Sequence, residues 1–240
     1  MRWTSLKGLA ILPLLVVPTR AADRPLETLL PSNAQILETK DISTIAGKPR
    51  TLVLWMTGAV KVHDRDEYCG TSVYGDYWRG NAKLSVIDSS AQHVVNTLGL
   101  GDVDLPFYVK GYYYHIDRPD QAHKGKPDIL HLSDLTGEGR AAQFRIFEYE
   151  ACGIAAARIY GYRPQTDRAV AYDVEVRERN HTHREQNIDN VFDRDPVKPG
   201  YWDITWKPGH GSDDTYHDIV HFDAKRQIFV DRHVTIKGRF

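Results

Sequence analysis

Between Leu132 and Gly139 the sequence places an oxygen-bearing side chain at every second position. These residues are Asp134, Thr136 and Glu138, with Gly137 among them. Carboxylate and hydroxyl oxygens are ligands for hard cations, and glycine permits the tight wrap that brings them onto one ion. The pattern therefore predicts a calcium site. A second interpretation is a glycine-rich turn in which Asp134 and Thr136 bond to their own backbone.

The same residues, entered from the apolar pair Ile129-Leu130, resemble one FG-GAP repeat of the integrin-α-type β-propellers. In that family a strand runs into an Asp-rich loop that contains glycine. The resemblance implies a propeller blade with a calcium-binding loop that serves adhesion or ligand binding. This sequence departs from the family pattern after the loop, where Ala142, Gln143 and Arg145 stand in place of further carboxylates.

Aromatic residues in two glycine-containing stretches form a second candidate site. Exposed rings on loops can stack on the apolar faces of sugars, which predicts a glycan-binding surface. Aromatic side chains on strands more commonly pack in the core or against a neighbouring strand, so both interpretations stay open. The rings assigned to the candidate ligand surface are Tyr74, Tyr77, Trp78, Tyr201 and Trp202.

The sequence does not assemble a catalytic set. His181 and His183 would share one face of a strand, but a third ligand with suitable spacing is missing, so surface histidines are favoured over a zinc site. The segment 209–214 contains Ser, His and Asp without the strand-to-helix elbow of a hydrolase. The sequence therefore favours an exported, non-catalytic binding or structural protein. The alternative is a carbohydrate-binding or carbohydrate-active protein that uses the aromatic loops.

The strands that would position these residues are visible as period-2 alternation, which is typical of half-buried strands. Three hairpins are predicted, each preceded by a further strand, and this recurrence suggests internal repetition. The expected fold is all-β and propeller-like, with a β-sandwich as the alternative. The predicted hairpins span 82–98, 155–176 and 218–234, and the preceding strands lie within 51–62, 127–147 and 201–206.

Residues 1–21 read as a signal peptide, with Arg2 and Lys7 before an apolar run and Ala21 at the cleavage position. The run is about half the length that spans a bilayer, so no membrane span is expected. We expect residues 22–50 to form a lead-in and residues 51–240 to form the β-rich domain. The protein would then be secreted or periplasmic.

Charge composition limits the partners that the sequence favours. The chain holds 31 Lys and Arg against 32 Asp and Glu. This balance gives no electrostatic reason to expect nucleic acid. A glycan or an extracellular protein fits an exported binding module better, although the sequence does not identify the partner.

The two cysteines, Cys69 and Cys152, are expected to form a disulfide in an oxidising compartment. Closing a loop of this length stabilises the fold by about 4–5 kcal/mol in the chain-entropy model. We expect the mature, non-reduced protein to show no free thiol when titrated with a thiol reagent in denaturant. Two reactive thiols per chain before reduction would contradict the pairing.

Overall fold

Strands dominate the regular structure, as the alternation predicted. The structure is a computed structural model, and its strands form separate sheets, none of which closes on itself. In the part of the chain that the structure describes, no helix is long and apolar enough to cross a membrane. The described residues are 25–64, 67–68, 71–72, 75–100, 107–108, 129–151, 154–208 and 213–238.

The N-terminal sheet has the strand order β1-β2-β5-β6, all antiparallel, and a short strand β7 also pairs with β5. A 3₁₀ helix η1 precedes the sheet, helix α1 connects its first two strands, and a two-stranded sheet β3-β4 lies between β2 and β5 in sequence. The bounds are η1 Leu26–Leu29, β1 Ala34–Asp41, α1 Ser43–Ala46, β2 Arg50–Asp64, β3 Glu67–Tyr68, β4 Thr71–Ser72, β5 Gly75–Asp88, β6 His93–Gly99 and β7 Phe107–Tyr108.

The middle sheet is built around β9, which pairs with β8 along one edge and with β10 and β13 along the other. The C-terminal sheet has the order β12-β11-β16-β15-β14, in which β11 and β16 are parallel and the other pairs antiparallel. The bounds are β8 Gln143–Ala151, β9 Ile154–Arg163, β10 Arg168–Ala171, β11 Val174–Arg177, β12 Thr182–Glu185, β13 Ile188–Asp189, β14 Tyr201–Trp206, β15 Thr215–Asp223 and β16 Ile228–Ile236.

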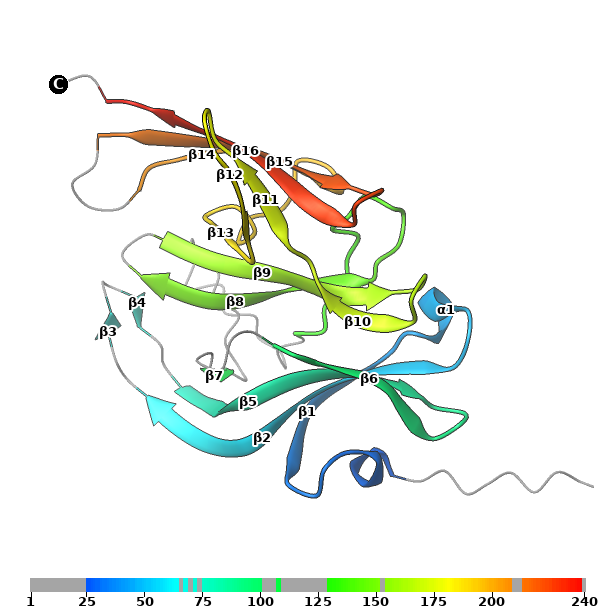
Figure 1. Ribbon diagram of the computed structural model, residues 1–240. Coiled ribbons are helices and arrows are strands. Elements are labelled where there is room, and N and C mark those ends of the chain that lie inside the picture. The colour runs from blue at the N-terminus through cyan, green and yellow to red at the C-terminus, as the bar shows by residue number, and fades with distance from the viewer. Residues whose placement is uncertain are drawn as a thin grey trace, which may run out of the picture.

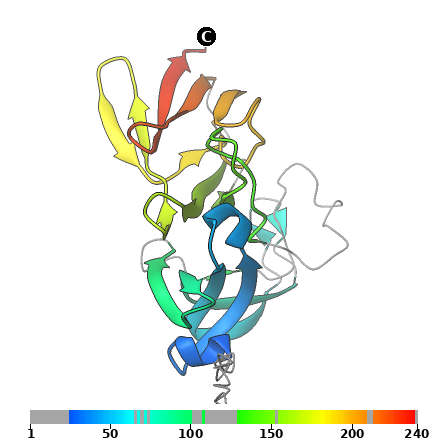
Figure 2. The same ribbon diagram turned by 90° about the vertical axis from the view of Figure 1, so that its right-hand side faces the viewer.

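The three large sheets lie one above another, with the middle sheet between the other two (Figures 1 and 2). Strand β9 is buried on both faces. Its Tyr160 and Tyr162 belong to the core shared with the N-terminal sheet, whereas Ala157 and Ile159 belong to the core shared with the C-terminal sheet. Because successive strand residues point to opposite faces, one strand supplies both cores.

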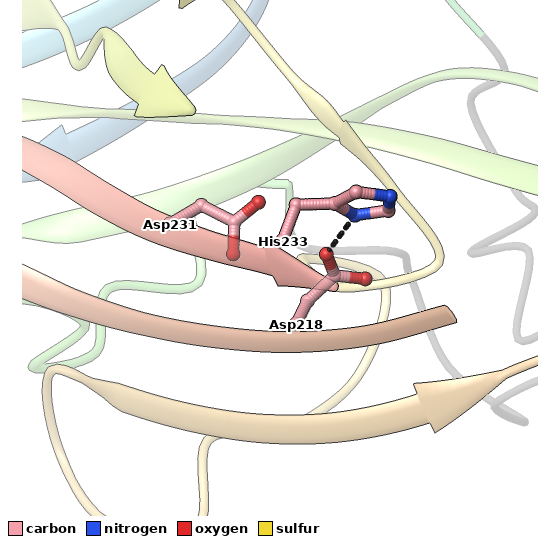
Figure 3. Close-up of side chains that lie close together, drawn as sticks. All are labelled: Asp218, Asp231 and His233. Carbon is pink, nitrogen blue, oxygen red and sulfur yellow. Dashed lines mark hydrogen bonds and ion pairs between the residues drawn. The ribbon is translucent and has the colours of Figure 1, made fainter. Parts of the chain in front are cut away.

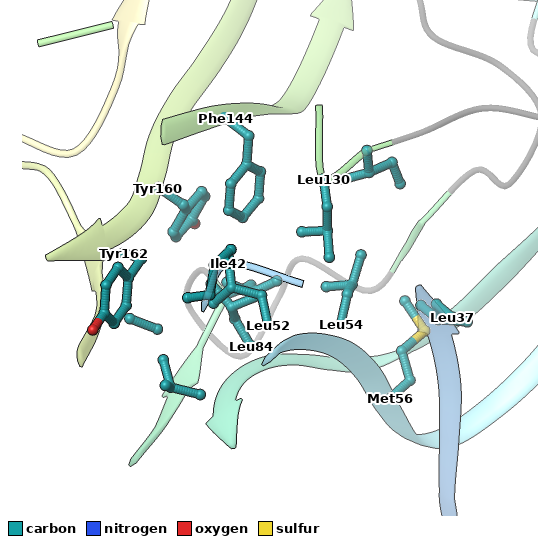
Figure 4. Close-up of a cluster of buried hydrophobic side chains, with 14 residues drawn as sticks. Leu37, Ile42, Leu52, Leu54, Met56, Leu84, Leu130, Phe144, Tyr160 and Tyr162 are labelled. Carbon is teal, nitrogen blue, oxygen red and sulfur yellow. The ribbon is translucent and has the colours of Figure 1, made fainter. Parts of the chain in front are cut away.

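The core between the N-terminal and middle sheets contains large aliphatic side chains packed against aromatic rings (Figure 4). Leu52, Leu54 and Met56 point into this core from β2. The ring of Phe144 stacks on that of Tyr160, with ring centroids 6.1 Å apart. The intervening β2 residues face the other side of the sheet, where a smaller cluster includes residues of the η1 segment. Strand β2 is therefore also buried on both faces.

The predicted strands and turns are largely confirmed. The hairpins β5-β6, β9-β10 and β15-β16 turn at 89–92, 164–167 and 224–227, and each continues an antiparallel ladder from the preceding strand β2, β8 or β14. The lead-in segment before β2 includes an element that the sequence did not predict. It contains the single turn α1, which ends at Gly47 in the left-handed conformation (φ 68°).

An ion-pair network joins the N-terminal sheet to the middle sheet. The Arg50 guanidinium donates to both carboxylate oxygens of Asp167, with Nη2 2.8 Å from Oδ2, and its Nη1 lies 2.6 Å from Asp88 Oδ2. The hydroxyl of Tyr162 donates to Asp167 Oδ1 at 2.7 Å. Arg50 holds the pKa of Asp167 well below its usual range, because its hydrogen bonds favour the charged carboxylate.

We expect Asp167→Asn to lower the free energy of unfolding by about 2–3 kcal/mol near neutral pH, because the buried Arg50 then lacks its main counter-charge. A lowered pKa stabilises the fold above the unfolded-state value, about 3.9, and this contribution is lost as pH falls through the lower folded-state value. Urea denaturation from pH 7 to pH 2 measures the effect. A difference between wild type and Asp167→Asn that stays constant below pH 4 would contradict the assignment.

Candidate functional site

The inward face of the C-terminal sheet changes from apolar to polar along the β15-β16 ladder. Phe222 lies opposite Phe229, and the next pairs on the same face are Val220 with Asp231 and Asp218 with His233. The first of these pairs belongs to the core shared with the middle sheet. The ladder thus places two carboxylates and an imidazole directly beyond an aromatic core. Figure 3 shows these three side chains close together.

Asp231 is the most unusual of these residues. Its side chain is fully buried, and neither carboxylate oxygen has a hydrogen-bond partner among the described residues. Burial raises the pKa of Asp231 to about 8, and the neighbouring Asp218 adds to the rise. A buried carboxylate without a partner is costly unless it binds a proton, a water molecule or a cation.

Asp218 is also fully buried, but its two oxygens have donors. Oδ2 accepts a hydrogen bond from Trp206 Nε1 at 2.6 Å, and Oδ1 lies 2.5 Å from His233 Nδ1. This bond to Asp218 raises the pKa of His233, since it favours the charged imidazolium. One potential ligand atom from each of Asp218, Asp231 and His233 lies within 4.8 Å of the other two.

An aromatic row borders this cluster on the same face of the sheet. The rings of Trp206 and Tyr216 meet edge to face with centroids 4.8 Å apart, and Tyr216 meets His233 in the same way at 5.0 Å. Both Trp206 and Tyr216 are half-buried. The row orients His233 and presents aromatic surface beside it.

A cavity of about 720 Å³ lies beside the cluster, where β11 ends at Arg177 and β16 continues to Ile236. Because the cavity lies where β11 ends, side chains from both faces of its neighbour β16 line it. Arg177 bonds to Glu175, whereas Arg179 and Arg232 have no hydrogen-bond or carboxylate partner in the described part of the chain. The residues that matter for its chemistry are Arg177, Glu178, Arg179, Arg232, His233 and Thr235.

The predicted calcium loop takes the form of a turn. Asp134 Oδ1 accepts hydrogen bonds from the backbone N–H groups of Gly137 (2.8 Å) and Glu138 (3.2 Å), and Oδ2 accepts one from Gly139 (2.8 Å). This is the alternative in which the carboxylate bonds to its own backbone. Among the described residues, three or more His, Cys, Asp or Glu ligand atoms come together only at Asp218, Asp231 and His233.

The other two predicted calcium ligands also have protein partners. Thr136 is buried and its hydroxyl lies 3.4 Å from Glu138 Oε2, while Glu138 Oε1 accepts from Gln227 Nε2 at 3.2 Å. A Cβ added at Gly137 would lie 2.6 Å from the carbonyl oxygen of Pro199. The loop therefore packs backbone against backbone on the segment that leads into β14, and calcium binding there stays a prediction.

The predicted aromatic ligand surface is described only in part. Tyr74 lies outside the described residues, and for Tyr77 and Trp78 only the backbone of β5 is described. Tyr201 is half-buried, with Lys198 Nζ 5.2 Å from its ring centroid. Trp202 is fully buried and donates from Nε1 to the carbonyl oxygen of Arg194, so its ring packs in the core and is not offered to a ligand in this arrangement.

The predicted disulfide cannot be placed on the fold, because Cys69 and Cys152 both lie outside the described residues. The pairing stays a prediction.

Sequence reasoning did not identify Asp218, Asp231, Arg232 or His233 as site residues. One signal for them was present. Asp218 has the same strand parity as Val220 and Phe222, and Asp231 the same parity as Phe229, so two acidic residues occupy inward positions of an apolar alternation. A charged residue at such a position needs a partner or a function.

The comparisons with known proteins found no match, either among protein-family models, among curated proteins or among solved structures. The function of the site is therefore argued from its own geometry and charge.

We expect Asp134→Ala to lower the free energy of unfolding in EDTA by about 1–2 kcal/mol, because three backbone N–H groups lose their acceptor. Urea denaturation measures this, with Asp134→Asn, which keeps one carbonyl acceptor, as the milder variant. Repeating both curves in millimolar Ca²⁺ tests the metal hypothesis: an ion at this loop would stabilise wild type but not Asp134→Ala. Unchanged stability of Asp134→Ala in EDTA would contradict the turn assignment.

Proposed function

We propose that the protein is an exported, non-catalytic binding protein whose ligand is a small anionic molecule or group held in the cavity at the β11-β16 edge. The observation that carries this proposal is the pair Arg179 and Arg232, two guanidinium groups that line one cavity without a carboxylate partner in the described part of the chain. Export is supported by the signal-like residues 1–21.

The charge of the lining favours an anion. Three guanidinium groups line the cavity against the single carboxylate of Glu178, and Arg177 is partly neutralised by Glu175. Arginine presents a planar fork of N–H donors that matches carboxylate, sulfate and phosphate oxygens. The hydroxyl of Thr235 adds a neutral donor at the same cavity.

Binding fits the geometry better than catalysis. His233 is held by Asp218 as a base would be, but its other ring nitrogen, Nε2, lies 3.5 Å from the hydroxyl oxygen of Thr235. A base that activates a hydroxyl nucleophile lies about 2.6–3.2 Å from it. The neighbouring Arg179 and Arg232 have donors only, so they position an anion rather than move a proton.

A second candidate, an acidic saccharide as ligand, is favoured by one further observation. The half-buried rings of Trp206 and Tyr216 run in a row up to His233, and His233 lines the same cavity. Aromatic rings stack on the apolar faces of sugars, while arginines bind their carboxylate or sulfate groups. This candidate keeps the carbohydrate-binding alternative but places it on rings other than those predicted from the sequence.

We expect the mature protein to bind a sulfated or uronic acid oligosaccharide in isothermal titration calorimetry, and a neutral oligosaccharide of equal length much more weakly. The double variant Arg179→Gln/Arg232→Gln should weaken binding of the anionic probe by about 100- to 10,000-fold, since each of the two lost charge-assisted hydrogen bonds contributes about 1.5–3 kcal/mol. Binding should also weaken as salt is raised.

Arg140→Gln/Arg168→Gln is the matched control, because it removes the same number of charges at two exposed arginines outside the cavity. This variant should bind the anionic probe as wild type does. Equal loss of affinity in the control and in Arg179→Gln/Arg232→Gln would show that net charge, and not this cavity, binds the probe. Inorganic phosphate and sulfate, titrated alone, then separate recognition of a free anion from recognition of the saccharide.

A further inference from the structure

Close to the cavity-lining His233, Asp231 presents a buried carboxylate whose two oxygens have no hydrogen-bond partner among the described residues. Its closest polar neighbours include Asp218, a second buried carboxylate, so two acidic groups face each other away from bulk solvent. Two such groups in a protein interior repel unless a cation or a proton lies between them. The arrangement therefore points to a positively charged occupant.

The spacing of the three side chains matches a single ion. Potential ligand atoms of Asp218, Asp231 and His233 all lie within 4.8 Å of one another. Oxygen and nitrogen ligands bind zinc at about 2.0–2.2 Å, so two ligands on opposite sides of one ion are at most about 4.4 Å apart. The 4.8 Å limit exceeds this span by only about 0.4 Å, so an ion would have to draw the three side chains of Figure 3 slightly closer together.

We propose that Asp218, Asp231 and His233 bind a divalent transition-metal ion of the Zn²⁺ or Mn²⁺ class. The imidazole in the ligand set favours such an ion over Ca²⁺, which takes oxygen ligands. Three protein ligands leave at least one coordination position for water or another small ligand.

The groups around the ligands support a metal site. Trp206 Nε1 donates to the second oxygen of Asp218 at 2.6 Å and so fixes the orientation of that carboxylate. Tyr216 packs edge-on against the ring of His233 and restricts its rotation. Asp218 Oδ1 and His233 Nδ1 share a hydrogen bond at 2.5 Å, and metal binding releases the proton that they share.

A structural acid pair with one shared proton is the competing account of the same geometry. The two accounts differ in what an isosteric amide does. If Asp231 is a metal ligand, Asp231→Asn removes an unfavourable buried acid from the metal-free protein and abolishes metal binding. If Asp231 is a structural acid that donates to Asp218, the amide N–H replaces the carboxyl O–H as donor, so stability changes little and metal has no effect on either protein.

The test uses the full mature chain, dialysed against EDTA and then freed of chelator, with Zn²⁺ alone as the probe. We expect isothermal titration calorimetry to show one tightly bound ion per chain and thermal unfolding to show a higher melting temperature with Zn²⁺. Co²⁺ in place of Zn²⁺ should give visible d–d absorption that reports its ligand geometry. Asp231→Asn and His233→Gln should each weaken binding by at least about 10-fold, in line with the losses seen when supporting groups alone are changed.

Two matched controls come from the same sheet. His217 and Asp203 form an exposed pair at 2.8 Å on the opposite face, and His183 stacks on His181 near Glu185 on β12. His217→Gln and His183→Gln should leave the tight site intact. Loss of tight binding in either control, with Asp231→Asn unaffected, would place the ion elsewhere and overturn the proposal.

Failure of wild type to bind Zn²⁺ or Mn²⁺ stoichiometrically also overturns the proposal. If Asp231→Asn does not fold, His233→Gln decides, because His233 is partly exposed and its replacement keeps the buried carboxylates. The outcome is independent of the anionic-ligand proposal, since the probe is the metal alone. Metal binding without binding of any anionic probe would support this inference and reject the anionic-ligand proposal, and the reverse result would do the opposite.

Discussion

The structure depends on the double burial of strand β9. Its alternate side chains enter two different cores, so the middle sheet holds the N-terminal and C-terminal sheets on its opposite faces (Figure 1). The side chains on the two faces of β9 differ in volume. Tyr160 and Tyr162 lie on one face, and the smaller Ala157 and Ile159 lie on the other. A one-residue slip of β9 would exchange these sets and disrupt both cores at once, which is why its register is strongly specified.

This arrangement explains how carboxylates come to be buried at the C-terminal sheet. The aromatic residues Phe222 and Phe229 dock that sheet on the middle one, and the hairpin register then fixes which residues follow on the same face. Asp231 and Asp218 come next, where the face is still shielded from solvent but no longer apolar. Their burial is thus a consequence of the packing that anchors the sheet. Two carboxylates buried together then require a proton or a cation between them.

Much of the fold could be predicted from the sequence, because period-2 alternation is a local property. The strands of the three hairpins follow from it directly, and turn-forming residues between them predict the hairpin turns. The order of the sheets does not follow from it, since alternation shows which residues share a face but not which sheet that face contacts. Helix α1 was missed because one turn of four residues carries too little periodicity to detect. The propeller-like closure stays a prediction.

The candidate site was harder to predict than the fold for the same reason. The adjacency of Asp218 and His233 depends on the register set by the turn at 224–227. The cavity exists because β16 continues beyond the last residue of β11 with which it pairs. By contrast, the Asp134 loop could be predicted as a candidate site because its residues are neighbours in sequence. Its carboxylate is instead occupied by three backbone N–H groups, a use that the same residue types serve in many turns.

The most direct test of the buried acidic cluster is a crystal structure of the protein grown with Zn²⁺, with data collected on both sides of the zinc absorption edge. We predict an anomalous peak between Asp218, Asp231 and His233, with Trp206 still donating to Asp218. Well-ordered density for all three side chains without an anomalous peak between them, in crystals that contain zinc, would contradict the account.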